Sequence, residues 1–225
     1  MRMAWLVMSI LSAFALPLGI PAQNVPVTIP VVIVEFSNPG VTPSHWTLSL
    51  HRDGSGHFHS DRGKLPEGEH LAEIDAPNVD REIQLNDEFA ERVFQAAQQH
   101  NWFNQDCESH LKVAFQGWKK LSYSGPEGQG SCTFNYSKDK DIQALGDSLI
   151  GVAETLREGA RLEILLQHDR LGLDKEMEYM TEATKDGRMR QTCTIREILE
   201  RLEGDQEVLE RVRKRAHTLL AHPGT

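Results

Sequence analysis

Residues 107–136 constrain the fold more than any other stretch, because they combine two cysteines with an alternating pattern of side chains. Alternation of apolar and polar residues predicts a strand over residues 112–124, and the glycines and proline of residues 125–130 predict a turn. On the return strand, Cys132 shares the core-facing side with Phe134. The expected apolar face of the first strand holds Val113, Phe115, Leu121 and Tyr123, with Lys119 as an exception.

A disulfide between Cys107 and Cys132 is the pairing that this hairpin favours, because a hairpin returns the chain to its starting point. Closing a loop of about 25 residues contributes roughly 3 kcal/mol by restricting the unfolded chain. Cys193 is then left over, and the other two pairings of three cysteines stay open.

The N-terminal residues predict export. Arg2 precedes an apolar run that Pro17 and Gly19 interrupt, a pattern typical of a secretory signal peptide. We expect residues 1–22 to be a signal peptide cleaved after Ala22, with cleavage after Ala15 or an uncleaved membrane anchor as alternatives. A periplasmic or secreted location also favours the disulfide, because those compartments are oxidising. After cleavage we expect no membrane span.

The strand-rich part of the chain comes first. Residues 31–36 are nearly all β-branched or aromatic and predict a central strand buried on both faces. Residues 45–60 predict a hairpin, and a three-residue loop over 53–55 places Phe58 on its core face. The next expected elements are a loop over 61–78, a short strand over 81–85 and a helix over 87–100.

Helical periodicity dominates after residue 137. The expected helices cover residues 142–159, 160–170, 174–185, a segment opened by a capping box at 194–197, and 206–221. The fold class is therefore α+β, with an N-terminal antiparallel-rich sheet, one packed helix and a helical C-terminal region. We expect a signal peptide at 1–22, a strand-rich domain at 23–137 and a helical region at 138–225. The helical region either packs on the same core or forms an appendage.

Three histidines of the 45–60 hairpin form the first candidate site. If Phe58 faces the core, His51, His57 and His59 all face away from it, and the expected loop places His51 directly opposite His57. Imidazole binds zinc and copper, so the three side chains form a candidate metal site. The alternative is a solvated face with three ordinary histidines.

Ser148 lies in Gly146-Asp147-Ser148-Leu149, which resembles the signature of the GDSL esterases. That resemblance implies a serine hydrolase with Ser148 as nucleophile. However, the sequence segment follows a helical pattern in mid-chain, and no Asp-x-x-His motif follows it to supply a base.

The signal sequence, the strand–Asp-Gly-Ser-Gly–strand segment and the cysteine-bracketed strand pair together resemble an uncharacterised family of exported bacterial proteins. The resemblance implies export and an α+β fold, and it assigns no catalytic residue. The net charge of −9 excludes a broad basic surface for nucleic acid. We expect a binding or structural component of the cell envelope or periplasm that is not an enzyme, uses no cofactor, and contacts a protein or another envelope partner.

Overall fold

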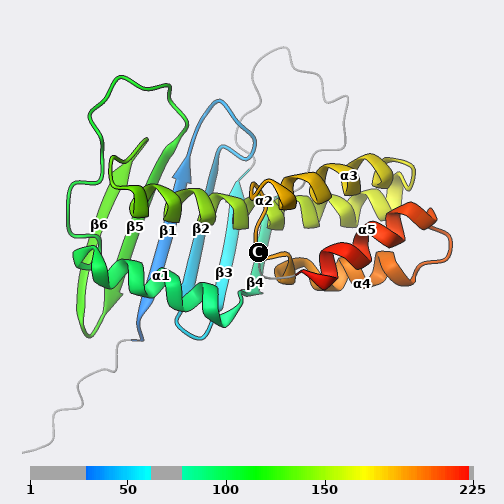
Figure 1. Ribbon diagram of the computed structural model, residues 1–225, viewed down its shortest axis with the longest axis horizontal. Coiled ribbons are helices and arrows are strands. Elements are labelled where there is room, and N and C mark those ends of the chain that lie inside the picture. Colours follow the sequence, from blue (N-terminus) through cyan, green and yellow to red (C-terminus); the bar gives the residue numbers. More distant parts are fainter. Residues whose placement is uncertain (1–28, 62–77, 223–225) are drawn as a thin grey trace, which may run out of the picture.

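A computed structural model of the chain describes residues 29–61 and 78–222 (Figure 1). The expected signal peptide, residues 1–22, lies outside the described residues. One sheet contains β1 (Val31–Ser37), β2 (His45–His51), β3 (Ser55–Asp61), β4 (Val79–Gln84), β5 (Trp118–Gly125) and β6 (Gly128–Phe134). The α-helices are α1 (Asp87–Gln99), α2 (Lys140–His168), α3 (Gly172–Lys185), α4 (Arg196–Gly204) and α5 (Glu210–Ala221). Two short 3-10 helices are η1 (Asn101–Phe103) and η2 (Thr192–Ile195).

The strands are antiparallel to their neighbours and follow the order β4-β3-β2-β1-β5-β6. Helices α1 and α2 lie across one face of the sheet, and α3, α4 and α5 lie beyond its β4 edge (Figure 1). This arrangement confirms the predicted α+β class. Within residues 29–61 and 78–222, no helix is both long enough and apolar enough to cross a membrane.

The described residues build two hydrophobic cores that share one helix. The first core joins the inner face of the sheet to α1 and to the first part of α2, as far as Ala160. The second core begins at Leu162 and joins the rest of α2 to α3, α4 and α5. The C-terminal helices therefore pack mainly on one another and on α2 rather than on the sheet.

The central position of β1 in the sheet was predicted correctly, but the prediction that both of its faces are buried was wrong. Val32, Val34 and Phe36 are buried, whereas the alternate side chains are half-buried or exposed. The helices cover one face only, so the β-branched residues of the other face lie on an open sheet surface.

In the β2–β3 hairpin, the predicted side chains face the core, but the residues that pair across the two strands differ from the prediction. Leu48 pairs with Phe58, which is buried, so the histidines do face away from the core. Residues 52–54 form the loop, one position earlier than expected. Ser49 rather than His51 therefore lies opposite His57, and Thr47 lies opposite His59.

The cysteine hairpin confirms the predicted disulfide, since Cys107 and Cys132 are bonded with a Cα–Cα distance of 5.6 Å. The strand expected from residue 112 begins only at Trp118. Gly117 interrupts the extension with a φ of +113°, and a Cβ there would lie 2.5 Å from the Phe36 ring. Beyond it, Leu121 and Tyr123 face the core as predicted, whereas Val113 and Phe115 are exposed.

Two expectations for the C-terminal helices were wrong. Residues 140–168 form one helix, because Gly159 is a packing position rather than a helix end. A Cβ on Gly159 would lie 2.3 Å from a methyl carbon of Ile195. No capping box opens α4, because the Thr194 hydroxyl donates to the Gln191 carbonyl and residues 192–195 form η2.

Candidate functional site

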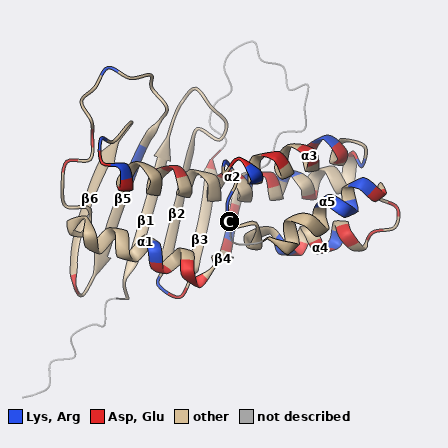
Figure 2. Cartoon of the chain, viewed as in Figure 1, with Lys and Arg blue, Asp and Glu red and all other residues tan. Residues whose placement is uncertain are grey.

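Residues 111–118, here called the apolar loop, expose four large hydrophobic side chains. Leu111 is 51% exposed, Val113 41%, Phe115 50% and Trp118 46%. The Phe115 and Trp118 rings meet edge to face with their centroids 5.8 Å apart. The segment between η1 and β5 projects past the ends of the neighbouring strands and is mostly uncharged (Figures 1 and 2). Isolated exposed hydrophobic residues are common, but four within eight residues are a concentration of apolar side chains suited to a partner.

The base of the apolar loop is fixed by Asn135, which follows β6. The Asn135 Oδ1 accepts a hydrogen bond from the Gln116 backbone N–H at 2.7 Å, and its Nδ2 donates to the Ala114 carbonyl at 3.1 Å. The backbone N–H of Asn135 donates to the Glu108 carboxylate at 2.6 Å. Together with the disulfide just before Glu108, these bonds tie the base of the loop to the segment after β6, and such restriction lowers the entropy lost on binding.

A buried lysine continues this network below the loop. Lys119 is only 1% exposed, and its Nζ donates to the Asn135 carbonyl at 2.7 Å. The ammonium lies 5.2 Å from the centre of the Phe134 ring, within the range of a cation–π contact. Burial lowers the pKa of Lys119, while the charges of Asp147 and Glu108 oppose that shift. Lys119 therefore links β5 to the chain segment that carries Asn135.

The structure brings two of the three candidate metal ligands together through an acidic residue that sequence reasoning missed. Asp80 on β4 lies opposite His59 on β3. Its Oδ1 is 2.7 Å from His57 Nε2, and its Oδ2 is 3.2 Å from His59 Nδ1. These hydrogen bonds from the two histidines lower the pKa of Asp80. A strand was expected over residues 81–85, so Asp80 lay outside it, and its register with β3 could not be predicted from local pattern.

His51 is on the same open face but has a different partner. Its Nδ1 lies 3.2 Å from the Pro30 carbonyl oxygen at the start of β1. The observed register also places His51 opposite neither His57 nor His59. The site that the structure assembles is therefore His57, Asp80 and His59, with His51 further along the same face.

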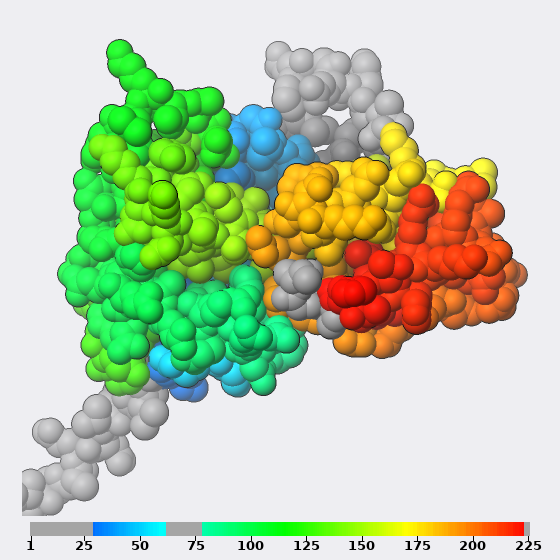
Figure 3. Space-filling model, in the orientation of Figure 1, coloured from blue at the N-terminus to red at the C-terminus, as the bar shows by residue number. Residues whose placement is uncertain are grey.

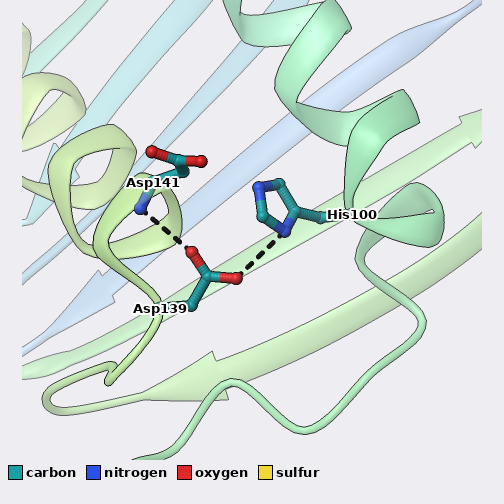
Figure 4. A group of neighbouring side chains, drawn as sticks. All are labelled: His100, Asp139 and Asp141. Atoms are coloured by element: carbon teal, nitrogen blue, oxygen red, sulfur yellow. Dashed lines mark hydrogen bonds and ion pairs between the residues drawn. The ribbon is translucent and has the colours of Figure 1, made fainter.

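A second cluster with metal-ligand chemistry joins the end of α1 to the start of α2 (Figure 4). Among the described residues, His100, Asp139 and Asp141 are the group whose ligand atoms all lie within 4.8 Å of one another. His100 Nδ1 is 3.2 Å from Asp139 Oδ2, while His100 Nε2 is buried without a hydrogen-bond partner. The other carboxylate oxygen of Asp139 accepts from the backbone N–H groups of Asp141 and Ile142. These bonds make Asp139 the N-cap of α2, a structural role that accounts for the cluster.

Ser148 lies on α2 and has no partner of the kind that activates a nucleophile. Its hydroxyl donates to the Ala144 carbonyl at 2.7 Å, one turn earlier in the helix. No histidine or carboxylate in the described part of the chain bonds it. This geometry is that of an ordinary helical serine.

Comparison of the sequence with protein-family models gave no match, and comparison with curated proteins gave none.

Proposed function

We propose that the chain is an exported, non-enzymatic binding protein of the cell envelope or periplasm, and that the apolar loop contacts its partner. The observation that carries this proposal is the combination of four exposed hydrophobic side chains with a firmly held loop base. An exposed apolar surface is a cost to an isolated protein in water, and covering it by a partner removes that cost. Phe115 and Trp118 are the kind of aromatic anchors that dominate interface energies.

Export is supported by the N-terminal pattern and by the disulfide. The run that follows Arg2 is typical of a signal peptide. Cys107 and Cys132 form a disulfide. Disulfides form and persist in oxidising compartments and are rare in the cytosol. Fractionation of cells that express the full chain tests export directly. We expect mature protein that begins at Gln23 outside the cytoplasm, whereas full-length protein with three alkylatable thiols in the cytosol would contradict it.

A photo-crosslinking experiment tests the role of the apolar loop. A benzophenone amino acid replaces Phe115 in one protein and Leu171 in a second protein, and each is illuminated with envelope material from the native host. Leu171 is the matched control, because it is 78% exposed and directly precedes α3, one of the helices that lie beyond the β4 edge of the sheet. We expect one discrete adduct from position 115 that the unlabelled wild type competes away.

The competition arm makes this result decisive. A competitor with Leu111→Ser and Phe115→Ser should fail to prevent the adduct, because the apolar contact area is lost. Equal adducts from positions 115 and 171, no adduct at either position, or equal competition by the variant would contradict the proposal.

A second candidate function is transition-metal binding on the open sheet face, favoured by the position of Asp80 between His57 and His59. The three side chains offer two imidazoles and one carboxylate, a ligand set that zinc accepts. Each histidine would give up its hydrogen bond to Asp80 on binding a metal there. His51 would contribute only after releasing the Pro30 carbonyl.

Metal titration separates this function from the first. If the open face binds metal, one equivalent of zinc or copper should bind to the wild type and be lost in the His57→Ala/His59→Ala variant. The Asp141→Asn variant is the control for binding at the His100 cluster. No stoichiometric binding, or binding that survives the double substitution, would exclude the histidine site.

A further inference from the structure

The helical lobe, which comprises the second part of α2 and the helices α3, α4 and α5, contains a cavity of about 620 Å³. The cavity lies between the C-terminal ends of α3 and α5. This volume lies within the range of about 300–1,000 Å³ for small-molecule sites. The two helix ends lie near the middle of the molecule in Figure 1, and α3 and α5 form adjoining surfaces in Figure 3. The wall consists of Thr181, Thr184, Lys185, Asp186, Gly187, Arg190, Thr218, Leu219 and His222.

Two cations of this wall have no counter-ion in the described part of the chain. Within residues 29–61 and 78–222, neither the Lys185 ammonium nor the Arg190 guanidinium makes a hydrogen bond or ion pair to a protein group. Several other arginines of these helices are paired with carboxylates, as Arg215 is with Asp174 at 2.7 Å. The acidic residue of the wall, Asp186, is already matched by Arg188 at 3.2 Å. Among the described residues, the wall therefore carries two cations without an ion pair and one carboxylate that is paired with Arg188.

The fold holds Arg190 in place through its backbone, which leaves the side chain free. The Arg190 backbone N–H donates to the Gly151 carbonyl and to the Thr155 hydroxyl, at 3.2 and 3.1 Å. The Arg190 carbonyl accepts from the same hydroxyl at 2.7 Å. The guanidinium lies over Gly187, which has a φ of +73° and whose added Cβ would be 3.2 Å from Nη2. Gly187 thus makes room for the guanidinium at the cavity wall.

The other polar side chains of the wall already make hydrogen bonds within their own helices. Lys185 and Arg190 are therefore the main hydrogen-bond donors available to a ligand. The hydroxyls of Thr181, Thr184 and Thr218 each donate to a carbonyl one turn earlier in their own helix. His222 Nδ1 lies 3.1 Å from the Thr218 carbonyl oxygen. Since an arginine fork and a lysine ammonium both suit carboxylate and phosphate oxygens, the ligand chemistry is that of an oxyanion.

We infer that this cavity binds a small organic oxyanion, a carboxylate or a phosphate monoester, with Arg190 and Lys185 holding the charged group. Leu219 and the threonine methyl groups form an apolar wall for the body of such a molecule. The site lies in the helical lobe, away from the apolar loop, so it is independent of the proposed partner surface.

Calorimetric titration with phenyl phosphate and with benzoate tests the inference on the full-length protein. We expect saturable binding of at least one probe that weakens with added salt. Arg190→Gln and Lys185→Gln should each weaken binding about tenfold or more, because each removes a charged hydrogen-bond donor. Lys175→Gln is the matched control, since Lys175 is exposed on the same helix outside the cavity and should leave the affinity unchanged.

The two probes distinguish the head group, and nuclear magnetic resonance locates the site. Binding of phenyl phosphate alone assigns a phosphate monoester, and binding of benzoate assigns a carboxylate. The backbone N–H signals of Gly187 and Thr218 should shift on titration in the wild type. Absence of binding at millimolar concentration, equal weakening by Lys175→Gln, or shifts confined to other residues would overturn the inference.

Discussion

Asn135 serves as a hydrogen-bonding partner for Ala114, to which its Nδ2 donates at 3.1 Å across a gap of 21 residues in the sequence. Its Oδ1 accepts from the backbone N–H of Gln116 on the same segment. One side-chain amide thus provides the donor and the acceptor that a neighbouring strand would offer. The apolar loop is thus tied to the segment after β6 without becoming part of the sheet.

The substitution Asn135→Ala should lower the free energy of unfolding by about 1–3 kcal/mol, because it removes two hydrogen bonds from a nearly buried site. Urea unfolding measures the loss, and hydrogen exchange of the Gln116 N–H should become faster. Gln99→Ala, at an exposed position of α1, is the control and should change stability by less than about 0.5 kcal/mol. Unchanged exchange at Gln116 would contradict the bridging role of Asn135.

The boundary of β5 shows why sequence pattern alone misjudged this loop. The alternation of Val113, Phe115, Leu121 and Tyr123 is that of a half-buried strand, and the second pair does face the core. Gly117 separates the pairs, but its positive φ and its contact with Phe36 depend on tertiary packing. Periodicity therefore located the strand correctly from Trp118 onward and extended it too far toward the N-terminus.

Reduction of the disulfide should lower the free energy of unfolding by about 2–4 kcal/mol, since the bond closes a loop with a sequence separation of 25 residues. Unfolding in guanidinium chloride with and without dithiothreitol measures this difference. The Cys107→Ala/Cys132→Ala variant should have the stability of the reduced protein and should not respond to dithiothreitol. Cys193→Ala should retain the full response, because Cys193 is a free thiol. Loss of the response in Cys193→Ala would show that the pairing differs.

The candidate sites differ in how far the sequence could predict them. The alternation of side chains along each strand correctly predicted that all three histidines lie on the open face, because alternation is a local property of a strand. Asp80 reaches them from β4 across a gap of about 20 residues, and the register of that pairing is a long-range property. The same holds for Arg190, whose neighbours come from α2, α3 and α5. Local periodicity predicts faces of elements, whereas sites assembled from several elements need their arrangement in space.

Asp139→Ala should cost about 1–2 kcal/mol of stability, because Asp139 caps α2 through the backbone N–H groups of Asp141 and Ile142. The same substitution breaks the contact with His100 Nδ1. Asp141→Ala, two residues further along the chain, is the matched control. It should lower the stability by less than about 1 kcal/mol, because it removes only a favourable interaction with the helix dipole. Thermal unfolding compares the two variants. Equal losses would show that Asp139 has no special capping role.

Glu158 is a buried acid whose pKa lies well above its usual value. It lies on α2 with 4% of its surface exposed, and its Oε1 accepts a hydrogen bond from Arg157 Nη2. Burial raises the pKa of Glu158 to about 8, the charge of Arg157 opposes this shift, and the neighbouring Glu176 adds to it. At neutral pH Glu158 therefore keeps its proton in the folded protein.

This raised pKa makes stability depend on pH in a defined direction. Between pH 4.5 and pH 8 the folded protein keeps a proton on Glu158 that the unfolded chain has released. The folded state thus binds more protons, and the contribution of Glu158 to stability falls as pH rises through this interval. Glu158→Gln imitates the protonated form, so it should stabilise the protein by about 1–3 kcal/mol at pH 9 and by almost nothing near pH 4.5.

Urea unfolding of the wild type and Glu158→Gln at pH 5, 7 and 9 measures this effect. The difference between the two proteins should grow from pH 5 to pH 9, because only the wild type must deprotonate a buried carboxyl group. Glu182→Gln is the control, since Glu182 is exposed on α3 and its variant should follow the wild type at each pH. A Glu158→Gln curve parallel to that of the wild type, or a variant less stable at pH 9, would show that Glu158 is ionised in the folded protein at neutral pH.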